Sequence, residues 1–366
     1  MQGTSAAPKR LNLHTMPEAK VAQPKPYLMT LTGGRTYLWC RCGRSANQPL
    51  CDGSHKGTGF EPVRYVAAAD GEEVLFCGCK QTSTPPFCDG THTNLPGGSL
   101  QDDPDTPENR AVPCVTEQSG ARRLLNGDCY VFSPPHASLR SEGTLQYCDV
   151  ISGELGSLHQ TTTFLRAAGA PSPIMRFATS DTILFVVKGS GTVTISGRSF
   201  PIAPTDGVFI RAGEAFQLAP AQDSQLELLA TTSPRADIQW LESMPQDFDA
   251  ACPQRIVSVD AAQRTAMGAR YFQLLVDKRI GSKVITQFIG HIPLSKAAPH
   301  RHLYEETILV LNGSGCMWTE DRKTEVRAGD VIFLPRKQVH SLQATDDDGL
   351  DVVGVICPGD NPSINY

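Results

Sequence analysis

The sequence predicts a mainly β protein, with a small cysteine-rich module at the N-terminus followed by two β-barrels. Three observations support this fold class. Beyond residue 113, runs of strand length are broken by Gly and Pro, and helical periodicity is almost absent before Asp260. Two of these β-rich units resemble each other, which indicates a duplication. Six of the twelve cysteines lie in two copies of one short motif near the N-terminus.

Length and charge exclude several classes of protein. A chain of 366 residues with 40% hydrophobic residues is long enough for two or three domains with packed cores. A net charge of -5, without a run of basic residues, argues against a nucleic-acid partner. The longest apolar runs, such as 182–187 and 307–311, have the length of strands, so we expect no membrane span.

Residues 1–26 are expected to form a disordered lead-in. This segment contains Pro and Ala, lacks the apolar core of a secretory signal, and has too few Arg and Ser for an organelle-targeting peptide. The protein is therefore expected to be cytoplasmic. Without a secretion signal, twelve cysteines favour metal ligation over a disulfide framework.

The repeated cysteine motif occupies the expected first domain, residues 27–97. Each copy reads Cys-x-Cys and, after eight further residues, Cys-Asp-Gly-(Ser/Thr)-His. Three thiolates and one imidazole in one short loop can hold either zinc or an iron–sulfur cluster, so spacing alone leaves both open. The candidate ligands are Cys40, Cys42, Cys51 and His55 in the first copy, and Cys77, Cys79, Cys88 and His92 in the second.

Both copies resemble the signature of the CDGSH iron–sulfur (mitoNEET-like) family at every defining position. That family binds one [2Fe-2S] cluster per motif through three Cys and one His, so the resemblance implies two clusters held by these eight residues. Tandem members fold as a monomer with pseudo-two-fold symmetry. Asp52 and Asp89 are expected to close each loop by accepting backbone N–H bonds, and Gly53 and Gly90 to supply its turn. An imidazole ligand raises the reduction potential, so each cluster should accept and pass one electron.

A linker and two related units follow. Residues 98–113 are rich in Pro, Gly and acidic side chains, as is typical of a linker. Beyond it, the segment 181–191 resembles 306–315, and 206–213 resembles 329–335. We expect a duplicated barrel, with units at 114–240 and 241–366.

The second unit carries a set of candidate metal ligands. His300 and His302 point to the same side if this stretch is extended, Glu306 follows after a turn, and His340 lies about one hairpin and a strand later. Three imidazoles and one carboxylate suit Fe(II), Mn(II), Ni(II) or Zn(II), and they leave positions open on a six-coordinate ion.

This pattern resembles the cupin family. Residues 300–313 fit the first cupin motif and residues 329–340 fit most of the second. Leu294, Lys337 and Ala344 depart from the family pattern, at positions that affect turns more than metal ligation. The resemblance implies that the second unit is a metal-binding cupin whose ligands, and catalytic residues, are His300, His302, Glu306 and His340.

The first unit is expected to be a metal-free cupin. Its alignment on the second unit puts Met175, Phe177, Asp181 and Gln217 at the four ligand positions. Of these, Asp181 alone is a good ligand for a divalent ion.

The combination of centres predicts an oxidoreductase that acts with O2. Inserting one oxygen atom into a small-molecule substrate needs two electrons beyond those of the substrate bond, and two [2Fe-2S] clusters can store that pair. We therefore expect an Fe(II)-dependent cupin oxygenase, a hydroxylase or monooxygenase, to which the clusters supply electrons. The sequence has no flavin or dinucleotide fingerprint, so a separate reductase or ferredoxin is expected as electron donor. Cupins often dimerise, so a homodimer is compatible with the sequence.

Two alternatives stay open. A cupin dioxygenase would place both oxygen atoms in the substrate without external electrons, and its clusters would restore or regulate the iron. A redox sensor or cluster-transfer protein would use the cupin to bind an effector without chemistry.

Three further side chains are candidates for the substrate pocket. Depending on the register of strand 284–289, either Gln287 or Phe288 faces inward. Tyr304 and Trp318 could flank the metal, although aromatic residues in barrels are more often plain core. Arg301, between two ligands, should point away from the metal.

Overall fold

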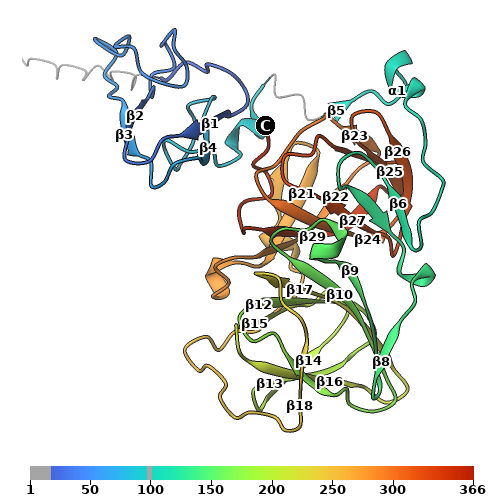
Figure 1. Cartoon of the computed structure of the whole chain (residues 1–366). Coiled ribbons are helices and arrows are strands. Elements are labelled where there is room, and N and C mark those ends of the chain that lie inside the picture. The colour runs from blue at the N-terminus through green and yellow to red at the C-terminus, as the bar shows by residue number, and fades with distance from the viewer. Residues whose placement is uncertain (1–17, 97–100) are drawn as a thin grey trace, which may run out of the picture. The chain divides into compact units, whose positions relative to one another are not determined.

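The computed structural model describes residues 18–96 and 101–366. The chain forms two compact units, Met1–His92 and Thr93–Tyr366. Both units are built mainly from strands, which confirms the predicted fold class (Figure 1). In the described ranges, no helix is both long and apolar enough to cross a membrane.

The first unit contains two small antiparallel sheets that lead into the cysteine motifs. Strand β1 (Tyr27–Leu31) pairs with β4 (Glu72–Phe76), and β2 (Thr36–Trp39) pairs with β3 (Val63–Val66). The first copy of the motif starts directly after β2, and the second starts directly after β4. A 3-10 turn, η1 (Thr91–Asn94), ends the second copy. Each copy is therefore held by the end of a strand, in equivalent positions.

Part of the expected lead-in is bonded to both motifs. Residues 1–17 lie outside the described residues, but the backbone N–H of Lys20 donates to Cys42 O (3.0 Å) and that of Ala22 to Gly78 O (3.2 Å). The prediction of disorder up to residue 26 is therefore wrong for this stretch. Composition does not reveal that a polar segment can pair with the backbone of a distant loop.

The second unit contains two barrels, each made of two antiparallel sheets. In the first barrel, the larger sheet has the order β19-β15-β12-β17-β10-β9-β8 and the smaller β14-β13-β16-β11-β18. Their bounds are β8 (Arg140–Glu142), β9 (Leu145–Ile151), β10 (Thr161–Ala168), β11 (Ile174–Arg176), β12 (Asp181–Lys188), β13 (Gly191–Ile195), β14 (Arg198–Ile202), β15 (Gly207–Ile210), β16 (Ala215–Pro220), β17 (Gln225–Ser233), β18 (Gln239–Leu241) and β19 (Ile256–Val257).

The second barrel has a larger sheet in the order β20-β21-β22-β29-β24-β27-β7-β6 and a smaller one in the order β26-β25-β28-β23-β5. The bounds are β5 (Gln101–Asp102), β6 (Arg122–Leu124), β7 (Tyr130–Phe132), β20 (Thr265–Met267), β21 (Arg270–Val276), β22 (Thr286–Ile292), β23 (Ser295–Ala297), β24 (Glu305–Asn312), β25 (Ser314–Trp318), β26 (Lys323–Arg327), β27 (Val331–Leu334), β28 (Ser341–Ala344) and β29 (Leu350–Cys357). The helical turns of this unit are α1 (Pro107–Ala111), η2 (Pro134–His136), η3 (Gly153–Leu155), η4 (Ala261–Gln263) and η5 (Lys278–Ile280).

The strand partners differ from the predicted boundaries. Strand β5 lies in the expected linker and pairs with β23, and β6 and β7 lie in the expected first barrel but extend the second through β27. Conversely, β19 lies beyond the expected boundary at residue 240 and pairs with β15 of the first barrel. The sequence pattern predicts that a stretch is a strand, but it does not identify the strand's partner.

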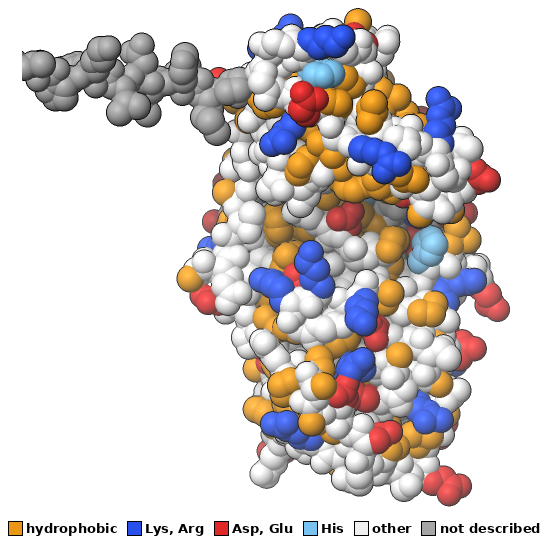
Figure 2. Space-filling model, turned by 90° about the vertical axis from the view of Figure 1, so that its left-hand side faces the viewer, with side chains coloured by type: hydrophobic (Ala, Val, Ile, Leu, Met, Phe, Trp, Pro, Cys, Tyr) orange, Lys and Arg blue, Asp and Glu red, His pale blue; other side chains and the backbone are white. Residues whose placement is uncertain are grey.

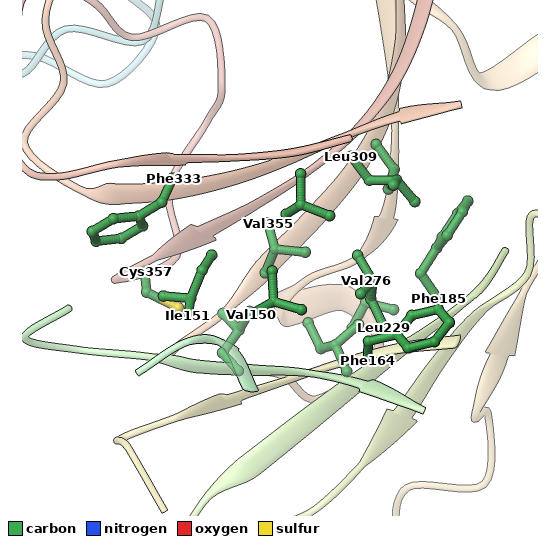
Figure 3. Close-up of a cluster of buried hydrophobic side chains, with 14 of the residues drawn as sticks. Val150, Ile151, Phe164, Phe185, Leu229, Val276, Leu309, Phe333, Val355 and Cys357 are labelled. Atoms are coloured by element: carbon green, nitrogen blue, oxygen red, sulfur yellow. The ribbon is translucent and has the colours of Figure 1, made fainter. Parts of the chain in front are cut away.

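A shared apolar core joins the two barrels. Phe164, Phe185 and Leu229 of the first barrel point toward Val276 and Val355 of the second (Figure 3). Each barrel also has its own interior core. Large apolar surfaces buried from both sides fix the two barrels against each other.

Charged side chains of both signs are mixed on the surface. On the face that Figure 2 presents, Lys and Arg are interspersed with Asp and Glu. This distribution agrees with the small net charge of -5.

A buried carboxylate also links the barrels. Glu305, 1% exposed at the start of β24, accepts hydrogen bonds from Ser157 Oγ (2.7 Å) and from the backbone N–H groups of Leu158 (2.6 Å) and His159 (3.1 Å). Those donors belong to a loop of the first barrel. Hydrogen bonds to a buried carboxylate are strong, and each donor would be costly to leave unpaired.

Replacing Glu305 by Ala is expected to lower the free energy of unfolding by about 3 kcal/mol, because the buried Ser157 hydroxyl and two partly buried backbone N–H groups lose their acceptor. Urea unfolding followed by intrinsic fluorescence measures the change. The matched control is Glu325→Ala on β26, an exposed carboxylate whose loss should change stability by less than about 0.5 kcal/mol. Equal effects of the two substitutions would contradict the assignment.

Candidate functional site

Three histidines meet inside the second barrel. The backbones of His300 and His340 pair with each other, with N–O distances of 3.1 and 3.0 Å, and His302 lies two residues further along the same extended stretch. One ring nitrogen from each of the three side chains lies within 4.8 Å of the other two. The stretch 299–304 therefore brings its two imidazoles to the same side, as predicted, and the segment after β27 brings the third.

Backbone carbonyls select the tautomer of each ring. The Nδ1 atoms of His300, His302 and His340 lie 2.7, 3.3 and 2.9 Å from the carbonyl oxygens of Ala298, Ile364 and Gln338. A carbonyl oxygen can only accept, so each Nδ1 carries the proton and each Nε2 keeps its lone pair for a metal ion. The contacts also hold each ring in a fixed orientation before any metal binds.

Glu306 lies next to the three histidines. Its Oε2 lies 3.5 Å from His302 Nε2, and the side chain is buried. Burial raises the pKa of Glu306 to about 8. Burial also lowers the pKa of His300 to about 4 and holds those of His302 and His340 well below their usual value. Three neutral imidazoles, together with a carboxyl group that loses its proton when a cation binds, fit a divalent ion.

Tyr304 lies beside the ligands, as predicted. Its ring stacks on that of His302, with centroids 4.5 Å apart and planes inclined by 12°, and its hydroxyl donates to Pro362 O (3.4 Å). Arg301 points away, as predicted, and its Nη2 lies 3.8 Å from Glu320 Oε1.

The predictions for Gln287 and Trp318 are wrong. Phe288 faces the metal side and packs with Tyr304, so Gln287 points between the barrels and lines a small cavity with Phe185 of the first barrel. Met317 faces the barrel core, so Trp318 lies on the other face of β25. Side-chain alternation along a strand reverses with a one-residue change in register, which a single sequence does not define.

Trp318 instead joins the outer face of the second barrel. Lys296 Nζ and Lys323 Nζ lie 4.8 and 4.2 Å from the centre of its ring, and its Nε1 donates to Gln343 Oε1 (3.0 Å). These contacts make it a packing residue.

The equivalent positions of the first barrel have other roles. Met175 and Phe177 belong to its apolar core. Asp181 accepts from the backbone N–H of Ala212 (3.1 Å), and the Gln217 amide donates to Ser172 O (2.8 Å).

The first unit groups its candidate ligands in pairs. In the first copy, the Sγ atoms of Cys40 and Cys42 are 3.7 Å apart, and Cys51 Sγ lies 3.1 Å from His55 Nδ1. The second copy repeats both pairs: Cys77 and Cys79 at 3.5 Å, and Cys88 and His92 at 3.4 Å. Two pairs of ligands fit a cluster of two irons, each of which takes one pair.

An aspartate closes the loop in the same way in both copies of the motif. Asp52 accepts from the backbone N–H groups of Ala46 (2.8 Å) and Ser54 (2.9 Å), and Asp89 accepts from those of Ser83 (2.8 Å) and Thr91 (3.1 Å). The side chain and backbone of Ser54 lower the pKa of Asp52 to about 2. The predicted role of both aspartates is confirmed, and the glycine after each has a positive φ, 94° and 87°.

The two copies differ in exposure. The side chain of His55 is 18% exposed, and its Nε2 lies 3.5 Å from Glu61 Oε2, whereas His92 is buried.

Sequence reasoning missed two cations near these sites. Arg270 precedes an apolar run in β21, and Lys80 follows Cys79 where the first copy has Gly43. The difference between Lys80 and Gly43 was visible in the aligned motifs. A single charge before an apolar run is too common to be a signal.

Family models match both parts of the chain. A model described as an iron-binding zinc finger of the CDGSH type matches residues 14–56, and a cupin domain model matches residues 292–356. The first match ends before the second copy of the motif, and the second match includes the three histidines and Glu306. The chain therefore carries a CDGSH iron–sulfur domain at its N-terminus and a cupin domain in its C-terminal part.

Two curated relatives match the iron–sulfur domain. The mouse protein "CDGSH iron-sulfur domain-containing protein 3, mitochondrial" is 53% identical over 49 residues, which are 13% of this chain and 36% of the relative. The human protein of the same name is 49% identical over 49 residues, 13% of this chain and 39% of that protein. This chain thus spans little more than a third of either relative.

Solved structures match the barrels. Oxalate decarboxylase from Lactobacillus farciminis, in complex with formate, has a TM-score of 0.50 at 17% identity and covers 64% of this chain and 87% of its own. Protein Ylba from E. coli has a TM-score of 0.50 at 14% identity, covering 70% and 98%. At these identities the similarity shows the fold.

The affinity of the histidine site for Mn(II) or Zn(II) is expected to rise about tenfold per pH unit up to about pH 8, and then to level off. Glu306 must lose a proton to bind the ion below its pKa of about 8, whereas His300, with a pKa of about 4, is already neutral in that range. Competition with a chelator measures the affinity. Glu306→Gln should bind more weakly and without this pH dependence, and a flat profile for the wild type would contradict the assignment.

Proposed function

We propose, on the premise that this chain carries a CDGSH iron–sulfur domain and a cupin domain, that it is an Fe(II)-dependent oxygenase. The reaction is hydroxylation of a small molecule, with electrons supplied by two [2Fe-2S] clusters of the same chain. One observation carries the proposal: the same polypeptide contains two cysteine motifs, each with its candidate ligands in pairs, and a buried group of three neutral imidazoles and one carboxylate. One-electron carriers in the same chain as an open metal site have a use in reductive oxygen chemistry.

The histidine site fits a mononuclear iron. The Nε2 atoms of His300, His302 and His340 and a carboxylate oxygen of Glu306 would hold it, and the ion would supply oxygen activation when bound. The three carbonyl contacts keep the imidazoles aimed at the ion. The stacked Tyr304 ring shields His302 from water on one side. Because the imidazoles are neutral, Glu306 compensates one of the two charges of the ion.

The paired ligands of the first unit fit the clusters. Each loop offers three thiolates and one imidazole, and the clusters would supply single electrons when bound. Because monooxygenation consumes two external electrons per product, a separate reductase or ferredoxin is part of the proposal as donor. The second cluster, held by Cys77, Cys79, Cys88 and His92, is likewise part of the proposal.

The test begins with iron and acid-labile sulfide in anaerobically purified protein. We expect about four cluster irons and about one further iron per chain. EPR after dithionite reduction detects the clusters, and addition of nitric oxide detects a mononuclear iron. Zinc in place of the mononuclear iron would contradict the proposal.

Matched variants separate the sites. His300→Ala is expected to lose the nitric-oxide signal and all oxygen uptake with a substrate, yet keep both clusters. Cys51→Ser and Cys88→Ser should each lose about half of the cluster iron, keep the nitric-oxide signal, and lose uptake driven by a reductase. Cys316→Ser, at a buried cysteine outside both motifs, is the control for thiol loss. Full activity of the two cluster variants would contradict electron supply.

Stoichiometry decides between mono- and dioxygenation. Hydroxylation consumes two electrons from the reductant for each O2, whereas a dioxygenase consumes none. Product formation without net consumption of reductant would therefore favour the dioxygenase. An absence of oxygen uptake with every candidate substrate would favour a sensor or cluster-transfer protein.

A further inference from the structure

Arg270 is a partly buried cation with two unpaired guanidinium nitrogens. Its Nε and Nη2 atoms are buried and have no hydrogen-bond partner among the described residues. Burial lowers the pKa of Arg270 to about 10, so the guanidinium stays charged at neutral pH. A buried charge that lacks an acceptor is costly, which makes such a group a candidate to bind an anion.

The position of Arg270 places its charge at the metal site. Arg270 and Phe272 lie two residues apart on β21, so both point to the same face. Phe272 packs in one cluster with Phe288 and Tyr304, and Tyr304 stacks on His302. The positive charge of Arg270 also reaches His300, where it adds to burial in lowering the pKa of the imidazole.

The charges of the occupied site do not balance. Three neutral imidazoles leave the two charges of a divalent ion, of which Glu306 compensates one, and Arg270 adds one more. Asp360, whose carboxyl group acts on Tyr304, can offset one of the remaining charges, so at least one positive charge is left over. This excess of positive charge lies beside the packed apolar side chains of Phe272, Phe288 and Tyr304, and it favours an anionic ligand, because screening by water is weak among buried groups.

The free atoms of Arg270 define the shape of that anion. Nε and Nη2 form one edge of the guanidinium, and their two N–H bonds are parallel. This edge matches the two oxygens of a carboxylate, and the apolar walls match an organic body.

We propose that Arg270 binds the carboxylate of the substrate, which is a small organic acid whose apolar part lies against Phe272 and Phe288. This inference rests on the proposed function, because it assigns a substrate class to the same metal site. Arg270 is thereby a specificity-determining residue, which positions the acid next to the ligand set.

Calorimetry on the full-length, metal-loaded protein, without O2 and without reductant, tests the inference. The probes are benzoate, phenylacetate and hexanoate, their primary amides, and inorganic phosphate. At least one carboxylate should bind, and its amide about tenfold more weakly or worse. Arg270→Gln should weaken carboxylate binding by a similar factor. The matched control is Arg301→Gln, which removes an arginine that points to Glu320 instead, and should leave binding unchanged.

Equal binding by wild type and Arg270→Gln, equal binding of acid and amide, or binding of phosphate but of no carboxylate would each overturn the proposal. So would a failure of all three acids to bind. If Arg270→Gln does not fold, protection of Arg270 in the wild type from phenylglyoxal by the carboxylate, read by mass spectrometry, decides instead. An acid that binds through Arg270 and is never oxidised would refute the oxygenase but leave this inference intact.

A second observation concerns Lys80 in the first unit. Its side chain is 6% exposed, and its Nζ donates to Cys77 O (2.9 Å). The same Nζ lies 4.7 Å from the ring centre of Trp39 and 5.7 Å from that of Tyr27. The indole N–H of Trp39 donates to the same carbonyl oxygen (3.0 Å), so Lys80 lies where the two loops meet.

Only one of the two loops can carry this lysine. Gly43 holds the equivalent place after Cys42, and both residues have a positive φ, 73° and 65°. A Cβ on Gly43 would lie 1.7 Å from Lys20 O, so no side chain fits there. A lysine in a left-handed conformation is strained, which indicates that its side chain is needed at this place.

The charge of Lys80 acts on both loops. Burial lowers its pKa to about 8, and thiolates of both copies, Cys40 and Cys77, oppose that effect. Reduction adds a negative charge to a cluster, and a fixed cation in a buried setting stabilises the reduced form.

We infer that Lys80 is a cation shared by the two clusters, which raises the reduction potential of both. Redox titration followed by EPR and absorbance tests this on the full-length protein. Lys80→Met should lower both midpoint potentials, and Lys80→Arg should restore them in large part. The control is Lys56→Met, which removes an exposed lysine next to His55 and should shift them much less.

Unchanged potentials in Lys80→Met, a shift no larger than that of Lys56→Met, or a shift in one cluster alone would overturn the inference. Iron and sulfide contents of the variants verify that both clusters are in place. If Lys80→Met loses a cluster, the potentials of Lys80→Gln and Lys80→Arg provide the comparison.

Discussion

The metal site depends on two adjacent carboxylates that point to opposite faces of one strand. Glu305 accepts three hydrogen bonds from the first barrel, and Glu306 faces the histidines. A shift of one residue in the register of β24 would exchange them, and would bury Glu306 against the wrong partners. In the first barrel, core and hydrogen-bonding residues occupy the positions equivalent to the metal ligands. The first barrel instead holds strand β24, which carries the candidate ligand Glu306 of the second barrel.

The sequence was sufficient to predict site residues where metal ligands must lie close together in a short motif. A ligand set must fit around one ion or cluster, so short motifs predicted that Cys51 and His55 share one site and that His300 and His302 meet. It was insufficient wherever the answer depends on a distant partner. Whether Gln287 or Phe288 faces the metal is decided by pairing with neighbouring strands, and the isolation of Arg270 is visible only once its surroundings are known.

The two units differ in the protein charges that surround their candidate metal sites. In the second barrel, burial keeps the imidazoles neutral, so a single carboxylate meets the charge of an ion. In the first unit, three thiolates per loop concentrate negative charge, and Lys80 is a buried cation that both loops share. The two loops, closed by Asp52 and Asp89, differ in the residue after the second cysteine, which is Gly43 or Lys80, and in the exposure of their imidazoles.

The pairing of β7 with β27 has a consequence for the synthesis of the chain. Residues 130–132 leave the ribosome long before residues 331–333, to which they pair, and the whole first barrel is made between them. The first barrel is therefore an insertion within the second. Strand β7, at the edge of the second barrel, stays unpaired until its partner β27 has been synthesised. A fragment that starts at the apparent beginning of the metal-binding repeat would lack that edge. Nascent chains of this protein acquire the histidine site last, after the two cysteine motifs and after the first barrel have been synthesised.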